Sequence, residues 1–223
     1  MFEQFRKIFS HSIVYGLGVI MSQAVGFLMI PVYTRYLTTQ DYGVLELLMR
    51  TGSVVSMLLV MGLGTAVMRL YADCKSDEEK AKVVATAMFL VLGLGTVSIA
   101  VLLTCADLLS SLVFSAGDYS FLFSLLLICN FFEMSLVVPF TLLRAQDKSR
   151  FYVAISLGRL VLALSLNICF VVFMHKTVDG ILYSSLITGA LCSLLLVTRT
   201  LRQTGLVFSV TAAKDLLAYG LPL

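Results

Sequence analysis

The chain has 223 residues, of which 59% are hydrophobic and only 13% are charged. A typical soluble domain carries about 25% charged residues, so this composition excludes a soluble enzyme and indicates a protein whose main solvent is lipid. The net charge of +3 is too small to indicate a nucleic-acid-binding protein.

Six apolar stretches are expected to cross a bilayer as helices, since a crossing takes about 20 apolar residues. They are residues 12–34, 44–68, 83–105, 119–143, 151–174 and 180–198. The first stretch lacks the cleavage pattern of a signal peptide, so we expect it to be retained. The predicted fold is therefore an all-α integral membrane bundle of six transmembrane helices over residues 1–213. The start of a seventh helix follows over residues 214–223.

The basic residues predict the orientation of these spans. If the N-terminus is cytoplasmic, the outside loops contain only Arg35 and Lys176, and Arg50 and Arg159 lie within spans. All other basic residues then lie in cytoplasmic segments, namely Arg6, Lys7, Arg69, Lys75, Lys80, Lys82, Arg144, Lys148, Arg150, Arg199, Arg202 and Lys214. Positive charge accumulates in the cytoplasmic loops of membrane proteins, so we expect a multi-pass protein with a cytoplasmic N-terminus.

Ionisable side chains inside the spans are the first candidates for function, because each costs about 2.5–3.5 kcal/mol at the centre of a span. The second predicted span contains Glu46 and Arg50, the fourth contains Glu133 and the fifth contains Arg159. Glu46 and Arg50 are four residues apart, so they share one helix face and can form an ion pair. Two interpretations of this pair stay open: an internal pair that permits insertion, or the charged lining of a water-filled cavity.

Polar residues follow one face of the fifth span. Tyr152, Ser156, Arg159, Ala163 and Asn167 recur at steps of three or four residues, which places them on one helical stripe. A helix of this kind faces lipid on one side and a cavity or packed interior on the other. Arg159 has no acidic residue within four positions, so its partner must come from another helix or from a ligand. Arg159 is therefore the main functional candidate.

The remaining polar candidates lie in the first and fourth spans. They are Gln23, Asn130 and Glu133, and we expect them to line the same cavity. Glu133 has two open interpretations, as the partner that neutralises Arg159 or as a carrier of a proton. No paired-cysteine motif, phosphate-binding loop or catalytic cluster is present, so we expect no metal site, no cofactor and no enzyme activity.

Four segments resemble the Wzx-type polysaccharide flippases, in the order in which that family has them. They are "RYLTTQDYGVLELL" after the first span, "LLRAQDKSRFYV" between the fourth and fifth, "VDGILYSSLITGAL" at the sixth and "LLAYGLPL" at the seventh. This family belongs to the MATE-like multidrug, oligosaccharidyl-lipid and polysaccharide exporter superfamily. The resemblance implies a transporter with two six-helix lobes around a central cavity, of which this chain is similar to the N-terminal lobe.

The resemblance also implies a function. The expected cargo is an undecaprenyl-pyrophosphate-linked oligosaccharide, moved across the bacterial inner membrane for O-antigen of lipopolysaccharide, capsule or exopolysaccharide synthesis. On this interpretation Arg50 and Arg159 meet the pyrophosphate or acidic sugars, and Glu133 is the hypothesised coupling site. Expected partners are membrane lipids, a second lobe or a second copy of this truncated half, and polysaccharide polymerase and chain-length proteins, with no nucleic acid.

Two alternatives stay open beside the flippase. A MATE-type exporter of cationic drugs would have more carboxylates than arginines in its spans, whereas the spans here hold two of each. A membrane scaffold subunit without transport would not depend on Arg50 or Arg159, provided that folding is intact.

Overall fold

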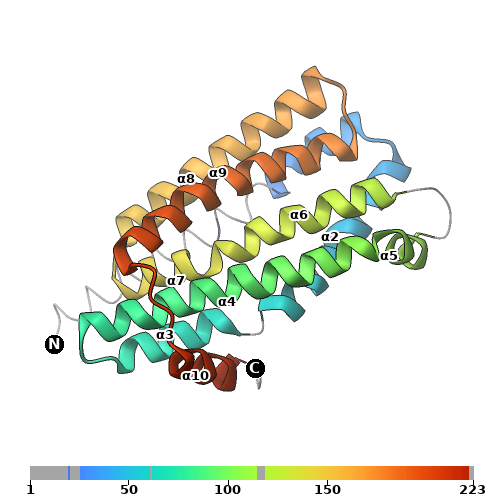
Figure 1. Ribbon diagram of the computed structural model, residues 1–223. Helices are drawn as coiled ribbons and strands as arrows, with labels where there is room; N and C mark the ends of the chain where they lie inside the picture. Colours follow the sequence, from blue (N-terminus) through green and yellow to red (C-terminus); the bar gives the residue numbers. More distant parts are fainter. Residues whose placement is uncertain (1–19, 21–25, 61, 115–118, 221–223) are drawn as a thin grey trace.

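The computed structural model describes residues 20, 26–60, 62–114 and 119–220. Within this part of the chain the regular structure is helical, and no strand occurs. The long helices α4 (Asp77–Thr104), α6 (Ser120–Ser135), α8 (Ser149–Asn167) and α9 (Val178–Thr204) run side by side along one axis (Figure 1). The remaining elements are α2 (Thr39–Val60), α3 (Leu63–Asp73), α5 (Ala106–Val113), α7 (Val137–Ala145), η1 (Ile168–Phe173) and α10 (Val210–Gly220).

Five helical stretches in the described part are long and apolar enough to cross a membrane. They are Thr39–Asp73, Asp77–Thr104, Ser120–Ala145, Ser149–Phe173 and Val178–Thr204. The prediction of an all-helical, multi-pass type of fold is confirmed in this form, and the five stretches overlap the second to sixth predicted spans. Most of the first predicted span lies outside the described residues, so the count of six stays a prediction.

Two of the five stretches are broken where the local sequence cannot continue a regular helix. Between α2 and α3, Gly62 adopts a left-handed backbone with φ of 64°, which glycine reaches without the steric cost of a Cβ atom. Between α6 and α7, the break falls at Leu136. Pro139 follows three residues later and clashes with the carbonyl four residues before it, that of Ser135, which is where α6 ends.

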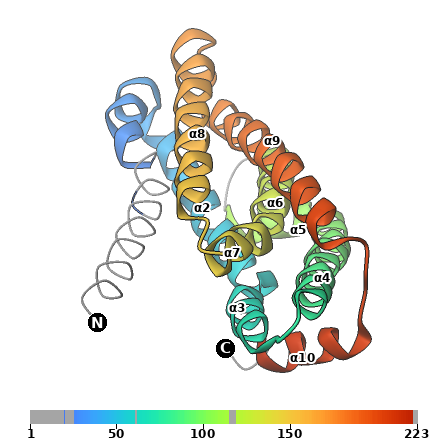
Figure 2. The same ribbon diagram turned by 90° about the vertical axis from the view of Figure 1, so that its left-hand side faces the viewer.

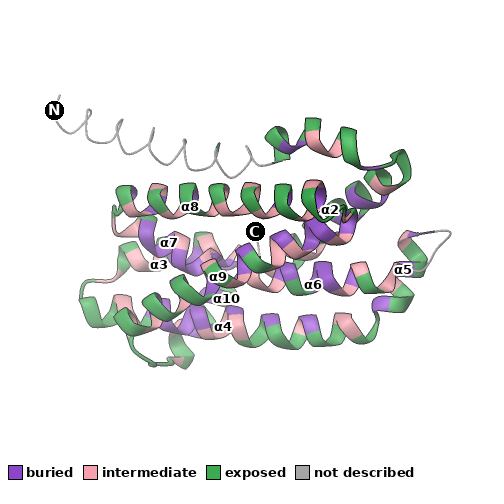
Figure 3. Ribbon diagram, turned by 90° about the horizontal axis from the view of Figure 1, so that it is seen from above, coloured by how far each residue is buried: buried purple, intermediate pink, exposed green. Residues whose placement is uncertain are grey.

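The apolar core is centred on α6. One cluster joins α6 to α2 and α9 and includes the fully buried Phe123, Leu127 and Leu48. A second cluster joins α3, α4 and α7 and includes Val67 and Met88. Figure 3 shows α6 and α7 rich in buried residues, while exposed residues recur along one side of α8. One side of α8 is therefore not covered by other helices of the described part.

α10 packs against α3 and α4, beneath the bundle in the view of Figure 2. Leu216 is fully buried in this contact, and the Arg69 guanidinium lies 4.6 Å from the centre of the Tyr219 ring. Just before the helix, the backbone N–H of Ser209 donates to the Thr86 hydroxyl at 3.0 Å. The helix begins at Val210, somewhat before the start expected near residue 214.

Candidate functional site

A cavity of about 1010 Å³ lies between the helical residues 26–36 and the helices α2, α6, α7, α8 and α9. Its lining extends from Tyr33 and Asn167, where α8 ends, to Arg144 toward the other end of the bundle. The end with Arg144 holds the α3–α4 and α7–α8 connections, and we call it the predicted cytoplasmic end. The volume is large enough to admit a ligand of considerable size, since small-molecule sites are about 300–1,000 Å³.

The polar stripe of α8 lies along this cavity. All five of its residues line the cavity wall, which are Tyr152, Ser156, Arg159, Ala163 and Asn167. On the opposite face of the helix, Leu157 and Val161 are 39% and 58% exposed. The apolar side of α8 is therefore available to lipid, and its polar side faces the interior.

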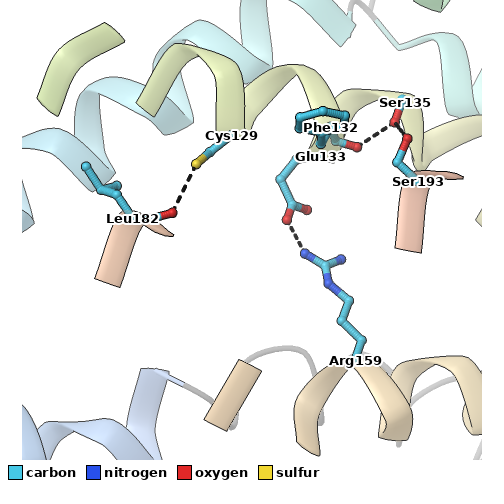
Figure 4. A network of polar contacts seen from close by, with 7 residues as sticks. All are labelled: Cys129, Phe132, Glu133, Ser135, Arg159, Leu182 and Ser193. Carbon is cyan, nitrogen blue, oxygen red and sulfur yellow. Dashed lines mark hydrogen bonds and ion pairs between the residues drawn. The ribbon is translucent and has the colours of Figure 1, made fainter. Parts of the chain in front are cut away.

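Arg159 forms an ion pair with Glu133 across the cavity wall. Its Nη2 donates to the Oε1 of Glu133, so that α8 is linked to α6 (Figure 4). The side chains remain 28% and 41% exposed, respectively, because both line the open cavity. The sequence leaves two interpretations open for Glu133, as the partner of Arg159 or as a carrier of a proton. In the structure, Glu133 is paired with Arg159.

The backbone that carries Glu133 is fastened to α9 on both sides. The Cys129 thiol donates to the carbonyl oxygen of Leu182 at 3.4 Å, and the Ser135 and Ser193 hydroxyls are 2.7 Å apart (Figure 4). These contacts bracket Glu133 on the same helix. The carboxylate is therefore presented to the cavity from a fixed helix, whereas its partner Arg159 extends from the more open α8.

The second ion pair, between Glu46 and Arg50, lies within α2. Both Nε and Nη2 of Arg50 are 2.8 Å from Glu46 Oε1. The Arg50 and Glu46 side chains are 80% and 51% exposed and line the same cavity. The pair can both permit insertion of the helix and form part of a charged cavity lining, because it is formed within α2 and is also open to the cavity.

A network of hydrogen bonds centred on Asn167 joins three helical segments at the cavity wall. The Tyr33 hydroxyl donates to Asn167 Oδ1 at 2.9 Å. Asn167 Nδ2 donates to Ser184 Oγ and to the Ala163 carbonyl oxygen, each at 2.9 Å. Asn167 is the last residue of α8 before the π-helical η1, a type of segment that often lies at functional sites.

We expect Asn167→Leu to lower the free energy of unfolding by about 1–3 kcal/mol, because the buried Ser184 and the Tyr33 hydroxyl both lose a partner. Thermal unfolding in detergent measures the change. Ser156→Ala is the matched control, since the Ser156 hydroxyl donates at 2.9 Å only to the Tyr152 carbonyl of its own helix. Equal losses in the two variants would show that the network does not hold the segments together.

One of the residues expected in the cavity does not belong to its described lining. Asn130 is buried between α6 and α2, where its Nδ2 donates to the Gly52 carbonyl oxygen at 3.2 Å. Gly52 has no side chain, so the two helices approach closely and Asn130 is used in packing; its expected place in the cavity lining is corrected accordingly. Gln23 lies outside the described residues.

Arg144 and Thr188 are two of the cavity-lining residues that were not among the sequence candidates. Arg144, expected in a loop, is in the last turn of α7, with Nη2 3.3 Å from Thr141 Oγ1. Thr188 of α9 is 3% exposed, and within the described part its hydroxyl has no hydrogen-bond partner. Neither position carries a sequence signal, because an arginine near a helix end and a threonine in an apolar helix are ordinary.

The described lining of the cavity has a positive balance. Its arginines are Arg50, Arg144 and Arg159, and its carboxylates are Glu46 and Glu133. Within the described residues, no group of three or more histidine, cysteine, aspartate or glutamate side chains could hold a metal ion. Beside these charged groups, the lining contains hydroxyl groups and aromatic rings.

Comparison with known proteins identifies a family whose model matches this sequence. The model of the polysaccharide biosynthesis protein family matches residues 8–223. Among solved structures, the chain is similar to a MOP superfamily transporter from Pyrococcus furiosus, with TM-score 0.75, 19% identity, and coverage of 95% of this chain and 51% of that one. That transporter is described as having a binding pocket of reverse polarity that suggests a different function.

A MATE protein in complex with Br-NRF is also similar, with TM-score 0.70, 21% identity, and coverage of 92% of this chain and 51% of that one. The chain thus spans about half the length of both solved transporters. No curated protein matches it. At these identities the structural likeness shows a MATE-like fold.

Proposed function

This chain belongs to the polysaccharide biosynthesis protein family, and we propose that it forms the N-terminal lobe of a flippase. The proposed cargo is an oligosaccharide linked to undecaprenyl pyrophosphate, moved across the bacterial inner membrane for surface polysaccharide such as O-antigen or capsule. The observation that carries the proposal is the central cavity with Arg50, Arg144 and Arg159 at different depths. The forked donors of arginine match the oxygens of a pyrophosphate, which is the charged part of such a cargo.

The Glu133–Arg159 pair supplies an exchangeable anion site in this cavity. The Glu133 carboxylate occupies the donors of Arg159 that a phosphate oxygen would use. Exchange of one anion for another leaves the Arg159 guanidinium hydrogen-bonded throughout, so the charge of Arg159 never lacks a partner. The Thr188 hydroxyl is buried in the same wall and has no hydrogen-bond partner among the described residues.

Displacement gives Glu133 its proposed role in coupling. Once a phosphate group binds Arg159, the carboxylate no longer has that partner and is open to a proton or a cation from the cavity. The backbone of Gly189 passes nearby, since a Cβ atom there would lie 3.9 Å from Glu133 Oε1. α9 therefore borders the site at which the charge state changes, and its movement against α8 is the proposed response.

The exposed charges of α2 support a second lobe or a second copy as partner. Arg50 and Glu46 are largely exposed within a candidate span, and charges facing hydrocarbon there would be costly. We propose that this face looks onto a water-filled space closed by the partner. Polysaccharide polymerase and chain-length proteins are proposed as neighbours in the same pathway.

A drug exporter is the second candidate, favoured by the similarity to a MATE protein solved with Br-NRF. A cavity for cations needs a negative balance, whereas the described lining here has one more arginine than glutamate. The charge balance therefore favours the anionic cargo. A scaffold subunit, the third candidate, would need none of the cavity charges.

Complementation tests the proposal. A bacterium whose own O-antigen or capsule flippase is deleted receives this chain, or the chain joined to a second lobe where the gene encodes one, each with and without Arg159→Ala. We expect surface polysaccharide to return and to be lost with Arg159→Ala at unchanged protein level. Stable insertion without restored polysaccharide for several glycans would reject the flippase. Restoration that survives Arg159→Ala would reject the role of the cavity.

A further inference from the structure

A second, smaller cavity lies at the predicted cytoplasmic end of the bundle, between α3, the first turn of α4 and the end of α7. Its volume is about 310 Å³. Its charged lining consists of Lys80, Arg144 and Asp147, and its wall on α3 is formed by Met68 and Tyr71. We call it the lower pocket. Two basic groups beside one carboxylate give it a positive balance, like that of the central cavity.

The Lys80 ammonium group lies at the lower pocket and has hydrogen-bond donors available for an anion. Its Nζ lies 5.5 Å from the centre of the Tyr71 ring, which is within reach of a cation–π contact. Its ion pair with Asp77 is 3.7 Å long, and the Asp77 side chain is fully exposed, so water competes strongly for this pair. An ammonium group has three donors, and an anion in the pocket could accept from those that point inward.

Arg144 connects the lower pocket to the central cavity, because it lines both. It lies in the last turn of α7, and its side chain is steadied at Nη2 by Thr141 Oγ1. An anion that contacts Arg144 in the lower pocket therefore lies at the border of the central cavity, which Arg159 and Glu133 also line. The long, planar guanidinium can contact a phosphate from more than one side.

We propose that the lower pocket binds a phosphate group and that Arg144 passes this group into the central cavity. Binding in the pocket stands on its own residues, whereas the transfer step rests on the proposed function. Both a lipid headgroup and a free phosphate compound present this chemistry. Asp147 opposes the bound anion, so the pocket holds it weakly enough to release it onward.

The first arm of the test uses free pyrophosphate. Inorganic pyrophosphate is titrated into the purified full chain in a phosphate-free detergent by calorimetry, in the Arg159→Gln background, which weakens the central site. Lys80→Gln is expected to weaken binding about tenfold, as for the loss of one charge-assisted hydrogen bond. Asp147→Asn is expected to strengthen binding. The matched control is Lys82→Gln, the same change two residues along α4 on an exposed side chain outside both cavities.

The second arm uses a lipid source. Native mass spectrometry counts phosphatidylglycerol retained by the same variants after extraction from vesicles of phosphatidylglycerol and phosphatidylcholine. Loss of retention in Lys80→Gln alone, without a change for pyrophosphate, assigns the pocket to a lipid headgroup; the reverse assigns it to a free phosphate compound. If Lys80→Gln and Lys82→Gln agree in both arms, the pocket proposal is overturned, whatever complementation shows. Lys80-dependent binding in a chain that fails complementation would instead sustain the pocket and reject the flippase.

Discussion

Replacing Arg159 with glutamine is expected to weaken pyrophosphate binding in the central cavity about 10- to 100-fold. A hydrogen bond to a charged group contributes about 1.5–3 kcal/mol, and each 1.4 kcal/mol corresponds to a factor of ten. Glu133→Gln is expected to act in the opposite direction and to strengthen binding roughly tenfold, because it removes the carboxylate that competes for Arg159. Calorimetric titration in a Lys80→Gln background, where the lower pocket is weakened, measures both effects.

Arg50→Gln is expected to have a smaller effect on pyrophosphate binding than Arg159→Gln. Arg50 lines the same cavity, but its side chain is 80% exposed and its partner lies on its own helix, so we expect a change of about twofold. Thermal unfolding of every variant separates binding from folding. If Glu133→Gln weakens binding as much as Arg159→Gln does, the pair is a structural unit and anion exchange at Arg159 is rejected.

Gly52→Leu is expected to destabilise the protein by about 1–3 kcal/mol through overpacking. A Cβ atom at Gly52 would lie 3.0 Å from Leu126 Cδ1 and 3.2 Å from Asn130 Nδ2, and a leucine side chain would need still more room. The α2–α6 contact would open and the bond from Asn130 to the Gly52 carbonyl would be lost. A lower midpoint of thermal unfolding in detergent is the measurement.

Gly158→Leu provides the comparison for this packing effect. No heavy atom lies within 4 Å of a Cβ atom built at Gly158, so leucine there meets open space. Replacing a glycine inside a helix also reduces the freedom of the unfolded chain, which favours the folded state. We expect an unchanged or higher unfolding midpoint. A similar loss in both variants would mean that glycine is needed for a reason other than the α2–α6 contact.

Relations within a single helix could be predicted from the sequence. The polar stripe from Tyr152 to Asn167 lies along the cavity as the 3.6-residue period requires, and the Glu46–Arg50 pair forms at its four-residue spacing. The sequence also predicts which of the described helices are apolar enough to span a membrane, because transfer of a segment into lipid depends on the composition of that segment. These features need no knowledge of how one helix lies against another.

Contacts between helices were decided by the tertiary structure. The pairing of Glu133 with Arg159, the burial of Asn130 against Gly52 and the position of Arg144 between two cavities all depend on how neighbouring helices are rotated and spaced. That rotation comes from the summed packing of many side chains, and from breaks such as those at Gly62 and Leu136. The sequence by itself therefore determined a membrane helix bundle and one polar face, while only the packing of the helices determined which charges meet across the cavity.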